Sequence, residues 1–323
     1  MFRAAADNSK HAPNAFPKDV YADLDDLLRT RLFANQLNLQ FANPSKSLIS
    51  GPVHTRFKGR GMEFEEVRVY QPGDDIRTID WRVTARTQVA HTKLFQEERE
   101  KPVLLVVDQR SNMFFGSQRC FKSVYAAHIA ATLGWAAIYQ NDRVGALVFG
   151  DDQQRDVRPK RSKHAQLSFL QQLVEFNHKL ISPVPKNHRI AFNEILADVR
   201  RVAKPGTNIF ILSDFFDLTE DCKKNLYMLS RHNNVSLFHI YDALEQHWPK
   251  ASQLSVSNGR ERIKINASSA DFQRRYQANF TARMEQLRAI ANRLAVTVVD
   301  TCTTEDPDTL LKSLYSRQYK HKR

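Results

Sequence analysis

The sequence is poor in cysteine and glycine and lacks long apolar runs. Its three cysteines, Cys120, Cys222 and Cys302, are too few and too far apart to form a disulfide framework or a zinc site. The longest apolar stretch, AAHIAATLGWAAIY, is too short to span a bilayer, and the N-terminus has no apolar segment of the signal-peptide type. These absences predict a cytoplasmic protein without a membrane span.

The motifs of common enzyme classes are also missing. The histidines form no H-E-x-x-H pair, and there is no G-x-S-x-G elbow or G-x-x-x-x-G-K-[ST] loop. With ten glycines in the whole chain, no phosphate-cradling loop is evident. Asp74, Asp75 and Asp80 resemble a metal cluster for phosphoryl chemistry, but neighbouring arginines argue against this. We therefore expect a protein that is not an enzyme.

The chain is basic, with 48 Lys and Arg against 35 Asp and Glu, a net charge of +13. Part of the excess lies in RDVRPKRSKH (155–164) and in the terminal SRQYKHKR (316–323). Such runs are typical of solvated surfaces and tails, but they also suit a protein that binds nucleic acid or an anionic surface. We keep that function as the alternative.

Alternating strand and helix patterns begin at residue 102. PVLLVVD (102–108) and NIFILSD (208–214) are continuous apolar runs, as in fully buried parallel strands, and amphipathic helices follow them. The alternation predicts an α/β fold with a doubly wound, mostly parallel sheet. A hairpin is expected around Asn258 and Gly259.

The segments before residue 102 predict a different organisation. In YADLDDLLRTRLF, Leu24, Leu27, Leu28 and Leu32 form an apolar stripe typical of a docking helix, and GMEFEEVRVY is typical of a strand in a β-rich element. We therefore divide the chain into a disordered N-terminus (1–18), a helix plus β-rich element (19–100), the α/β domain (101–316) and a basic tail (317–323).

The densest charge pattern lies in residues 59–88, GRGMEFEEVRVYQPGDDIRTIDWRVTARTQ. Its carboxylates alternate with arginines around a tryptophan, and the residues concerned are Arg60, Glu63, Glu66, Arg68, Asp74, Asp75, Arg77, Asp80, Trp81 and Arg82. Paired arginines make half-buried carboxylates tolerable, so one interpretation is a structural ion-pair network joining the β-rich element to the α/β domain. The other interpretation is a surface that recognises a partner.

Two of the predicted strands end in aspartate, at Asp108 and Asp214. Ligands of such sheets bind beyond the carboxyl ends of the strands, where two carboxylates could hold a hard divalent cation. Alternatively, both residues cap the structure that follows each strand.

The segment GRGMEFEEVRVYQPGDDIRTIDWRVTAR, followed by KLFQEERE, LLVVD, DRVGALVFG and ILSDFFD, resembles the bacterial domain-of-unknown-function fifty-eight family over roughly residues 45–315. The resemblance implies a von Willebrand factor A-like (vWA) domain preceded by a β-rich element. It also implies a non-enzymatic adaptor that partners a MoxR-type AAA+ ATPase in protein maturation or complex assembly.

The resemblance further implies a degenerate metal-ion-dependent adhesion site. Such a site uses a D-x-S-x-S segment after the first strand and an aspartate after a later strand. This chain keeps the first aspartate as Asp108 and matches the later one with Asp214, but Arg110 and Asn112 stand at the two serine positions. Mg²⁺ prefers about six oxygen ligands, and Arg110 carries a fixed positive charge. We therefore expect Arg110 to pair with Asp108 or Asp214 in place of a metal and expect no cofactor, with Mg²⁺ at Asp108 and Asp214 as the disfavoured alternative.

Aromatic residues follow both strand-terminal aspartates. RSNMFFG places Phe114 and Phe115, together with Met113, after the first, and DFFD places Phe215 and Phe216 after the second. One interpretation is that they fold back to plug the end of the sheet. The other is that they form an apolar docking patch for the partner, rimmed by charged side chains.

Overall fold

A computed structural model describes residues 18–39, 54–55, 62–97, 102–180, 189–249, 254–257, 262–265 and 269–316. The chain divides into unit 1, Met1–Leu39 with Pro102–Arg323, and unit 2, Gln40–Lys101. The first helices thus group with the α/β unit, whereas the sequence grouped them with the β-rich element. Residues 1–17, the tail 317–323 and the Asn258–Gly259 turn lie outside the described residues.

Unit 1 is built on a six-stranded sheet in the order β11-β8-β7-β4-β5-β6. The strands from β11 to β5 are parallel, and β6 runs antiparallel at one edge. Their bounds are β4 Val103–Asp108, β5 Val144–Phe149, β6 Gln154–Lys160, β7 Asn208–Ser213, β8 Asn234–Tyr241 and β11 Thr297–Cys302. The predicted mostly parallel α/β sheet is confirmed.

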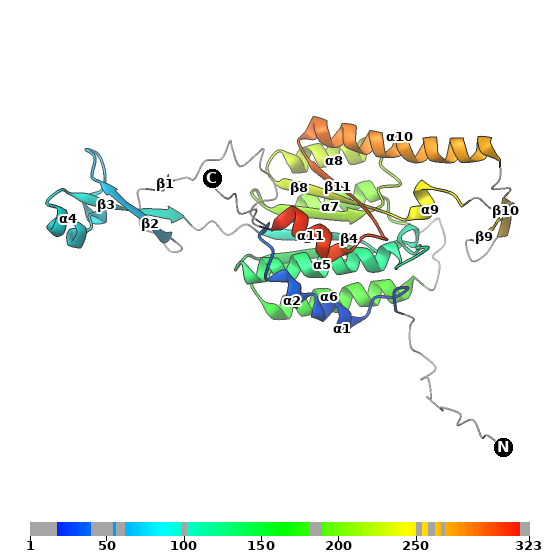
Figure 1. The fold of residues 1–323 in the computed structure, drawn as a ribbon, viewed down its shortest axis with the longest axis horizontal. Helices are drawn as coiled ribbons and strands as arrows, with labels where there is room; N and C mark the ends of the chain where they lie inside the picture. The colour runs from blue at the N-terminus through cyan, green and yellow to red at the C-terminus, as the bar shows by residue number, and fades with distance from the viewer. Residues whose placement is uncertain are drawn as a thin grey trace, which may run out of the picture. The chain divides into compact units, whose positions relative to one another are not determined.

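The strand patterns explain where the sheet is buried. Every residue of β4, β5 and β7 is buried, which agrees with their continuous apolar runs. Helices cover both faces, as in a doubly wound fold (Figure 1). A second small sheet pairs β9 (Leu254–Ser257) with β10 (Arg262–Ile265) in antiparallel fashion.

One face of the sheet is covered by α5 (Lys122–Tyr139), α6 (Lys163–Lys179) and α11 (Pro307–Tyr315). α5 is rich in alanine and buried along most of its length. α1 (Leu24–Arg29) packs against α5 and α6, and α2 (Arg31–Ala34) packs against α5.

The leucines of the expected docking helix are only partly buried. Leu27 is buried, but Leu32 is 70% exposed because the helix breaks at Thr30 and the spacing is not continued. The buried positions that follow the break are instead Ala34, Leu37 and Leu39.

The opposite face is covered by α7 (Phe192–Val202), α8 (Glu220–Ser230) and α10 (Ala270–Leu294). Of these, α8 and α10 are seen above the sheet in Figure 1. Apolar residues of these helices pack with β4, β5, β7 and β8 in one core cluster. α9 (Ala243–Gln246) follows β8, and a capping box between Asp242 and Glu245 stabilises its N-terminus.

The edge strand β6 is absent from the sequence-based prediction, which treated residues 155–164 as a basic surface run. Its alternating burial fits an edge strand with one face towards solvent. Gly145 of β5 lies under Pro159 of β6, where an added Cβ would approach the proline ring to 2.7 Å. The strand register also shifts beside Gly145, between Val144 and Ala146.

Unit 2 contains a three-stranded antiparallel sheet in the order β1-β3-β2. Its elements are β1 (His54–Thr55), β2 (Met62–Val69), the 3-10 helix η2 (Ile76–Thr78), α4 (Trp81–Thr87) and β3 (His91–Glu97). The predicted strand at GMEFEEVRVY is therefore present, while the helix at Trp81 was not anticipated.

Candidate functional site

The candidate site lies at the carboxyl edge of the sheet in unit 1, where β4 and β7 end side by side. β4 ends at Asp108, and its parallel neighbour β7 ends at Ser213, directly before Asp214. Both carboxylates therefore meet at one edge, as the two strand endings predicted. Each is almost completely buried, at 0% and 8% side-chain exposure.

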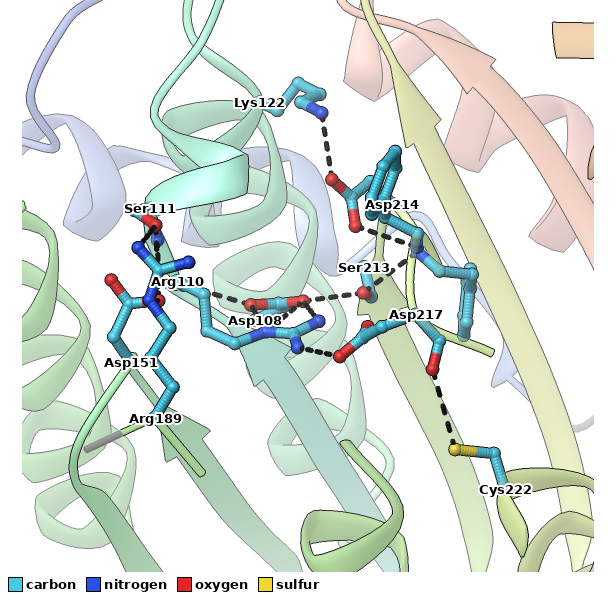
Figure 2. Close-up of polar contacts among 12 residues, drawn as sticks. Asp108, Arg110, Ser111, Lys122, Asp151, Arg189, Ser213, Asp214, Asp217 and Cys222 are labelled. Carbon is cyan, nitrogen blue, oxygen red and sulfur yellow. Dashed lines mark hydrogen bonds and ion pairs between the residues drawn. The ribbon is translucent and has the colours of Figure 1, made fainter. Parts of the chain in front are cut away.

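Arg110 holds Asp108 through a two-pronged ion pair (Figure 2). Its Nε donates to Oδ1 at 3.0 Å and its Nη2 donates to Oδ2 at 2.7 Å, while the Arg110 backbone N–H also donates to Oδ1 at 3.0 Å. The Ser213 hydroxyl donates to Oδ2 at 2.6 Å. Both Asp108 oxygens are thus engaged, and the expected pairing of Arg110 with Asp108 is present.

Arg110 is itself fixed from three further directions. Its Nη1 donates to Asp217 Oδ2 at 2.7 Å. Its guanidinium carbon lies 5.4 Å from the centre of the Phe149 ring and 5.3 Å from that of Phe192, both within cation–π range. Asp108 and the other partners raise the pKa of Arg110 although burial acts to lower it. The guanidinium is therefore a permanent charge in a fixed position.

Asp214 has a different cationic partner, Lys122, which the sequence analysis missed. Lys122 Nζ lies 3.1 Å from Asp214 Oδ2 and 2.8 Å from Glu245 Oε1, and its side chain is 1% exposed. Asp214 Oδ1 accepts the Phe216 backbone N–H at 3.2 Å. The available signal was a lysine at the start of the otherwise apolar helical run KSVYAAHIAATLGWAAIY.

Burial and charge pairing act in opposite directions on these groups. Burial alone would raise the pKa of Asp214, but Lys122 and Arg110 hold it below its ordinary value. Burial would lower the pKa of Lys122, but Asp214 and Glu245 raise it. Burial raises the pKa of Asp108 against the opposing effect of Arg110. The edge thus contains two buried cations, Arg110 and Lys122, each paired with buried carboxylates.

Ser111 and Asn112, which follow Arg110 in the D-x-S-x-S-like segment, do not contact the Asp108 carboxylate. Asn112 is exposed. The Ser111 hydroxyl donates to Asp151 Oδ1 at 3.2 Å and accepts from Arg189 Nη2 at 3.1 Å, away from the Asp108 carboxylate in Figure 2. Within the described parts of the chain, no group of three or more His, Cys, Asp or Glu side chains is arranged to hold a metal ion.

The expected aromatic patch is divided between buried and exposed residues. Met113 is completely buried, which agrees with the interpretation that this segment folds back and not with the exposed patch. Phe114 is half-buried and packs on Phe121 with ring centres 4.9 Å apart. Phe115 and Phe216 are 40% and 61% exposed. The apolar surface is therefore smaller than the sequence suggested.

Phe215 takes part in the core instead of the surface. It is 6% exposed, and its ring lies 5.9 Å from that of Phe192. Its backbone has a φ of 49°, in the left-handed region that non-glycine residues rarely adopt. This conformation turns consecutive phenylalanines in different directions, so Phe215 is buried while Phe216 faces solvent.

A pocket lies beside Phe216, between the end of β8 and α10. The Arg283 guanidinium carbon lies 5.0 Å from the centre of the Phe216 ring. The pocket lining is mainly aromatic and aliphatic, with Asp214 and Glu245 as its acidic members. Phe216 is therefore held at the rim of a concave, partly apolar surface.

In the described part of the charged motif of unit 2, two of the aspartates cap helices. Asp75 caps η2 by accepting the Arg77 N–H at 2.9 Å, and Asp80 caps α4 by accepting the Arg82 N–H at 3.0 Å. Asp74 forms an ion pair with Arg68 at 2.8 Å. Among the side chains that the structure describes, this last contact is the one arginine–carboxylate pair of the motif.

Trp81 does not pack beneath the charged residues of the motif. Its side chain is 67% exposed on α4. Arg77 and Arg82 are also exposed, and neither forms an ion pair within the described residues. Arg60 lies outside the described residues, and only the backbones of Glu63 and Glu66 are described, in β2.

Helices within the described ranges do not combine the length and apolar character that a membrane crossing requires. Among solved structures, BatB from Bacteroides thetaiotaomicron matches 66% of this chain and 96% of its own, at 12% identity and a TM-score of 0.38. An aerotolerance-related membrane protein from Bacteroides fragilis gives the same values.

Sequence relatives are uncharacterised proteins. One from Mycobacterium tuberculosis is 35% identical over 134 residues, 41% of this chain and 41% of the relative. YeaD from Bacillus subtilis is 31% identical over 101 residues, 30% of this chain and 25% of the relative. The chain thus matches less than half the length of these relatives. The family model described as "Protein of unknown function DUF58" matches residues 66–288, and the chain belongs to this family.

Proposed function

We propose that this protein is a non-enzymatic adaptor of the cytoplasm, with a vWA-like unit 1 that binds a MoxR-type AAA+ ATPase. The observation that carries the proposal is the pairing of both buried carboxylates at the sheet edge with side-chain cations. A group that is already held by a fixed partner is poorly placed to act as a nucleophile or base. The exposed side chains around this network remain free to contact another protein.

The proposal includes an adhesion-type edge that works without a metal. Both oxygens of Asp108 accept bonds from Arg110, and Asp214 accepts bonds from Lys122 and a backbone N–H. Mg²⁺ at this edge would have to displace Arg110 and Lys122 from the two carboxylates. The donor chemistry therefore does not fit Mg²⁺, and Arg110 takes the structural role of the cation.

We place ATPase docking on the exposed aromatics Phe115 and Phe216. They follow adjacent strands of the same edge, and Phe216 forms the rim of the pocket beside Arg283. An exposed aromatic beside an arginine and a partly apolar pocket has the composition of an interface hot spot. The network below keeps this surface rigid, which reduces the entropy lost on binding.

The test uses the full chain and a purified MoxR-type ATPase from the same organism. In a binding titration, Phe115→Ala combined with Phe216→Ala should weaken the complex at least tenfold, about 1.4 kcal/mol. Tyr227→Ala combined with Met228→Ala is the matched control, because these α8 residues are similarly exposed, at 50% and 51%. Equal losses in both double variants would contradict the docking site, and no binding by the wild type would contradict the partner.

The alternative function, binding of nucleic acid or an anionic surface, is favoured by one observation. Arg158 and Lys160 are exposed on the edge strand β6, beside the basic residues that follow it. Affinity for single-stranded DNA that falls steeply with salt, and is lost when both residues are replaced by glutamate, would support this function. Absence of binding at low salt would remove it.

A further inference from the structure

The adaptor proposal leaves unexplained a surface of unit 2 on α4. Trp81 is 67% exposed, and Arg82 and Arg86 are exposed on the same helix. Arg82 and Arg86 are one helical turn apart and therefore neighbours on one face. The inner side of α4 is formed by half-buried residues such as Thr84, whose hydroxyl accepts the His91 N–H at 3.0 Å. One side of α4 therefore packs against unit 2, and the other side is exposed to solvent.

Among the side chains that the structure describes, the arginines of this surface have no carboxylate partner. Residues 76–96 contain four cationic side chains, Arg77, Arg82, Arg86 and Lys93, and a single carboxylate, Asp80. Asp80 is already committed, because it caps α4 and pairs with Lys93 at 3.3 Å. Among the described residues, the three arginines form no ion pair, so their charges face solvent.

Exposed apolar side chains accompany these charges in the same unit. Besides Trp81, the exposed fractions are 52% for Val69, 64% for Ile76 and 48% for Val89. Tryptophan and arginine are the residues most enriched among interface hot spots, and aliphatic neighbours supply area that excludes water. Single-stranded nucleic acid instead requires several stacking aromatics along a basic groove, whereas α4 offers one.

We infer that the exposed face of α4, formed by Trp81, Arg82 and Arg86, is a docking surface for a carboxylate-rich region of a protein partner. Each guanidinium can donate two parallel hydrogen bonds to a carboxylate, and Trp81 supplies the apolar anchor. The surface lies in a different unit from Phe115 and Phe216. It stands whether or not an ATPase binds at the sheet edge.

The experiment measures binding of the full chain to labelled probes at low salt. The first probe is a peptide that alternates glutamate pairs with leucine, and the others are the same peptide with lysine for glutamate and an oligothymidylate. Arg82→Glu combined with Arg86→Glu should weaken binding of the acidic peptide at least tenfold, and Trp81→Ala at least threefold. Arg82→Lys combined with Arg86→Lys retains the charge and should retain most of the binding.

The control is Arg158→Glu combined with Lys160→Glu, which makes the same change in net charge on the exposed edge strand of unit 1. It should leave the affinity for the acidic peptide within twofold of wild type. Equal losses in the two glutamate variants would show only general charge attraction and would overturn the inference. Binding of oligothymidylate but not of the acidic peptide, abolished by the α4 substitutions, would overturn it in favour of nucleic acid.

Discussion

Lys122 Nζ lies 3.1 Å from Asp214 Oδ2, and both side chains are buried at the carboxyl edge of the sheet. Lys122→Met should therefore leave Asp214 with an uncompensated buried charge and destabilise the protein by about 3–5 kcal/mol. Chemical denaturation measures this difference. Lys122→Met combined with Asp214→Asn should be more stable than Lys122→Met alone, because the stranded charge is gone. Equal stability of wild type and Lys122→Met would show that the pair contributes nothing.

The Lys122–Asp214 pair should also affect how the free energy of unfolding depends on pH in the acidic range. The folded pKa of Asp214 lies below its ordinary value of 3.8, so the unfolded chain binds a proton there first as pH falls. This stabilisation is complete above the unfolded pKa and is lost as pH falls through the folded pKa. Lys122→Met removes the main cause of the lowered pKa. The stability difference between wild type and variant should therefore shrink below about pH 4, and a constant difference in urea unfolding from about pH 7 to pH 3 would contradict this.

Magnesium should have no effect on stability, because Arg110 and Lys122 already occupy the two carboxylates. A ligand that binds only the native state would stabilise it by about 2.7 kcal/mol at about 100 times its Kd. Differential scanning fluorimetry with millimolar MgCl₂ should show an unchanged midpoint. A rise that disappears in Asp108→Ala would establish a metal site and refute the assignment of Arg110.

Arg77 and Asp80 should differ in their effects although they are close in sequence. Arg77 is exposed without an ion-pair partner within the described residues, so Arg77→Ala should change the free energy of unfolding by less than about 0.5 kcal/mol. Asp80 accepts two backbone N–H groups at the start of α4, so Asp80→Ala should increase hydrogen exchange of the Arg82 and Val83 amides several-fold. A large loss of stability in Arg77→Ala would restore the interpretation of a structural ion-pair network.

The parts of the site that could be predicted from the sequence are those set by neighbours in the chain. Strand ends fix Asp108 and Asp214 at one edge because parallel strands share a direction, and Arg110 is two residues from its partner. Lys122 was missed because its partner Asp214 is 92 positions away, and no local pattern relates them. The sequence left open whether Phe215 is buried or exposed, because its left-handed backbone is not marked by a glycine.

The charged motif shows a second limit of sequence-based prediction. Counting arginines against carboxylates predicted a network, but Asp75 and Asp80 accept backbone N–H groups at helix starts, and the cation that pairs with Asp80 is Lys93. Composition cannot distinguish a carboxylate that caps a helix from one that pairs with a side chain, unless the helix start is identified first. Because the helix at Trp81 was not anticipated, the sequence could not decide between a structural network and a surface that recognises a partner.

Gly145 and Pro159, which lie against each other across β5 and β6, constrain how this sheet can change during evolution. A larger residue at position 145 would meet the proline ring, so it requires a smaller residue at position 159 at the same time. Proline has no N–H group and cannot donate a hydrogen bond to an added strand, which disfavours edge-to-edge aggregation. We therefore expect the two positions to covary among DUF58 proteins, with glycine kept wherever the edge strand keeps its proline.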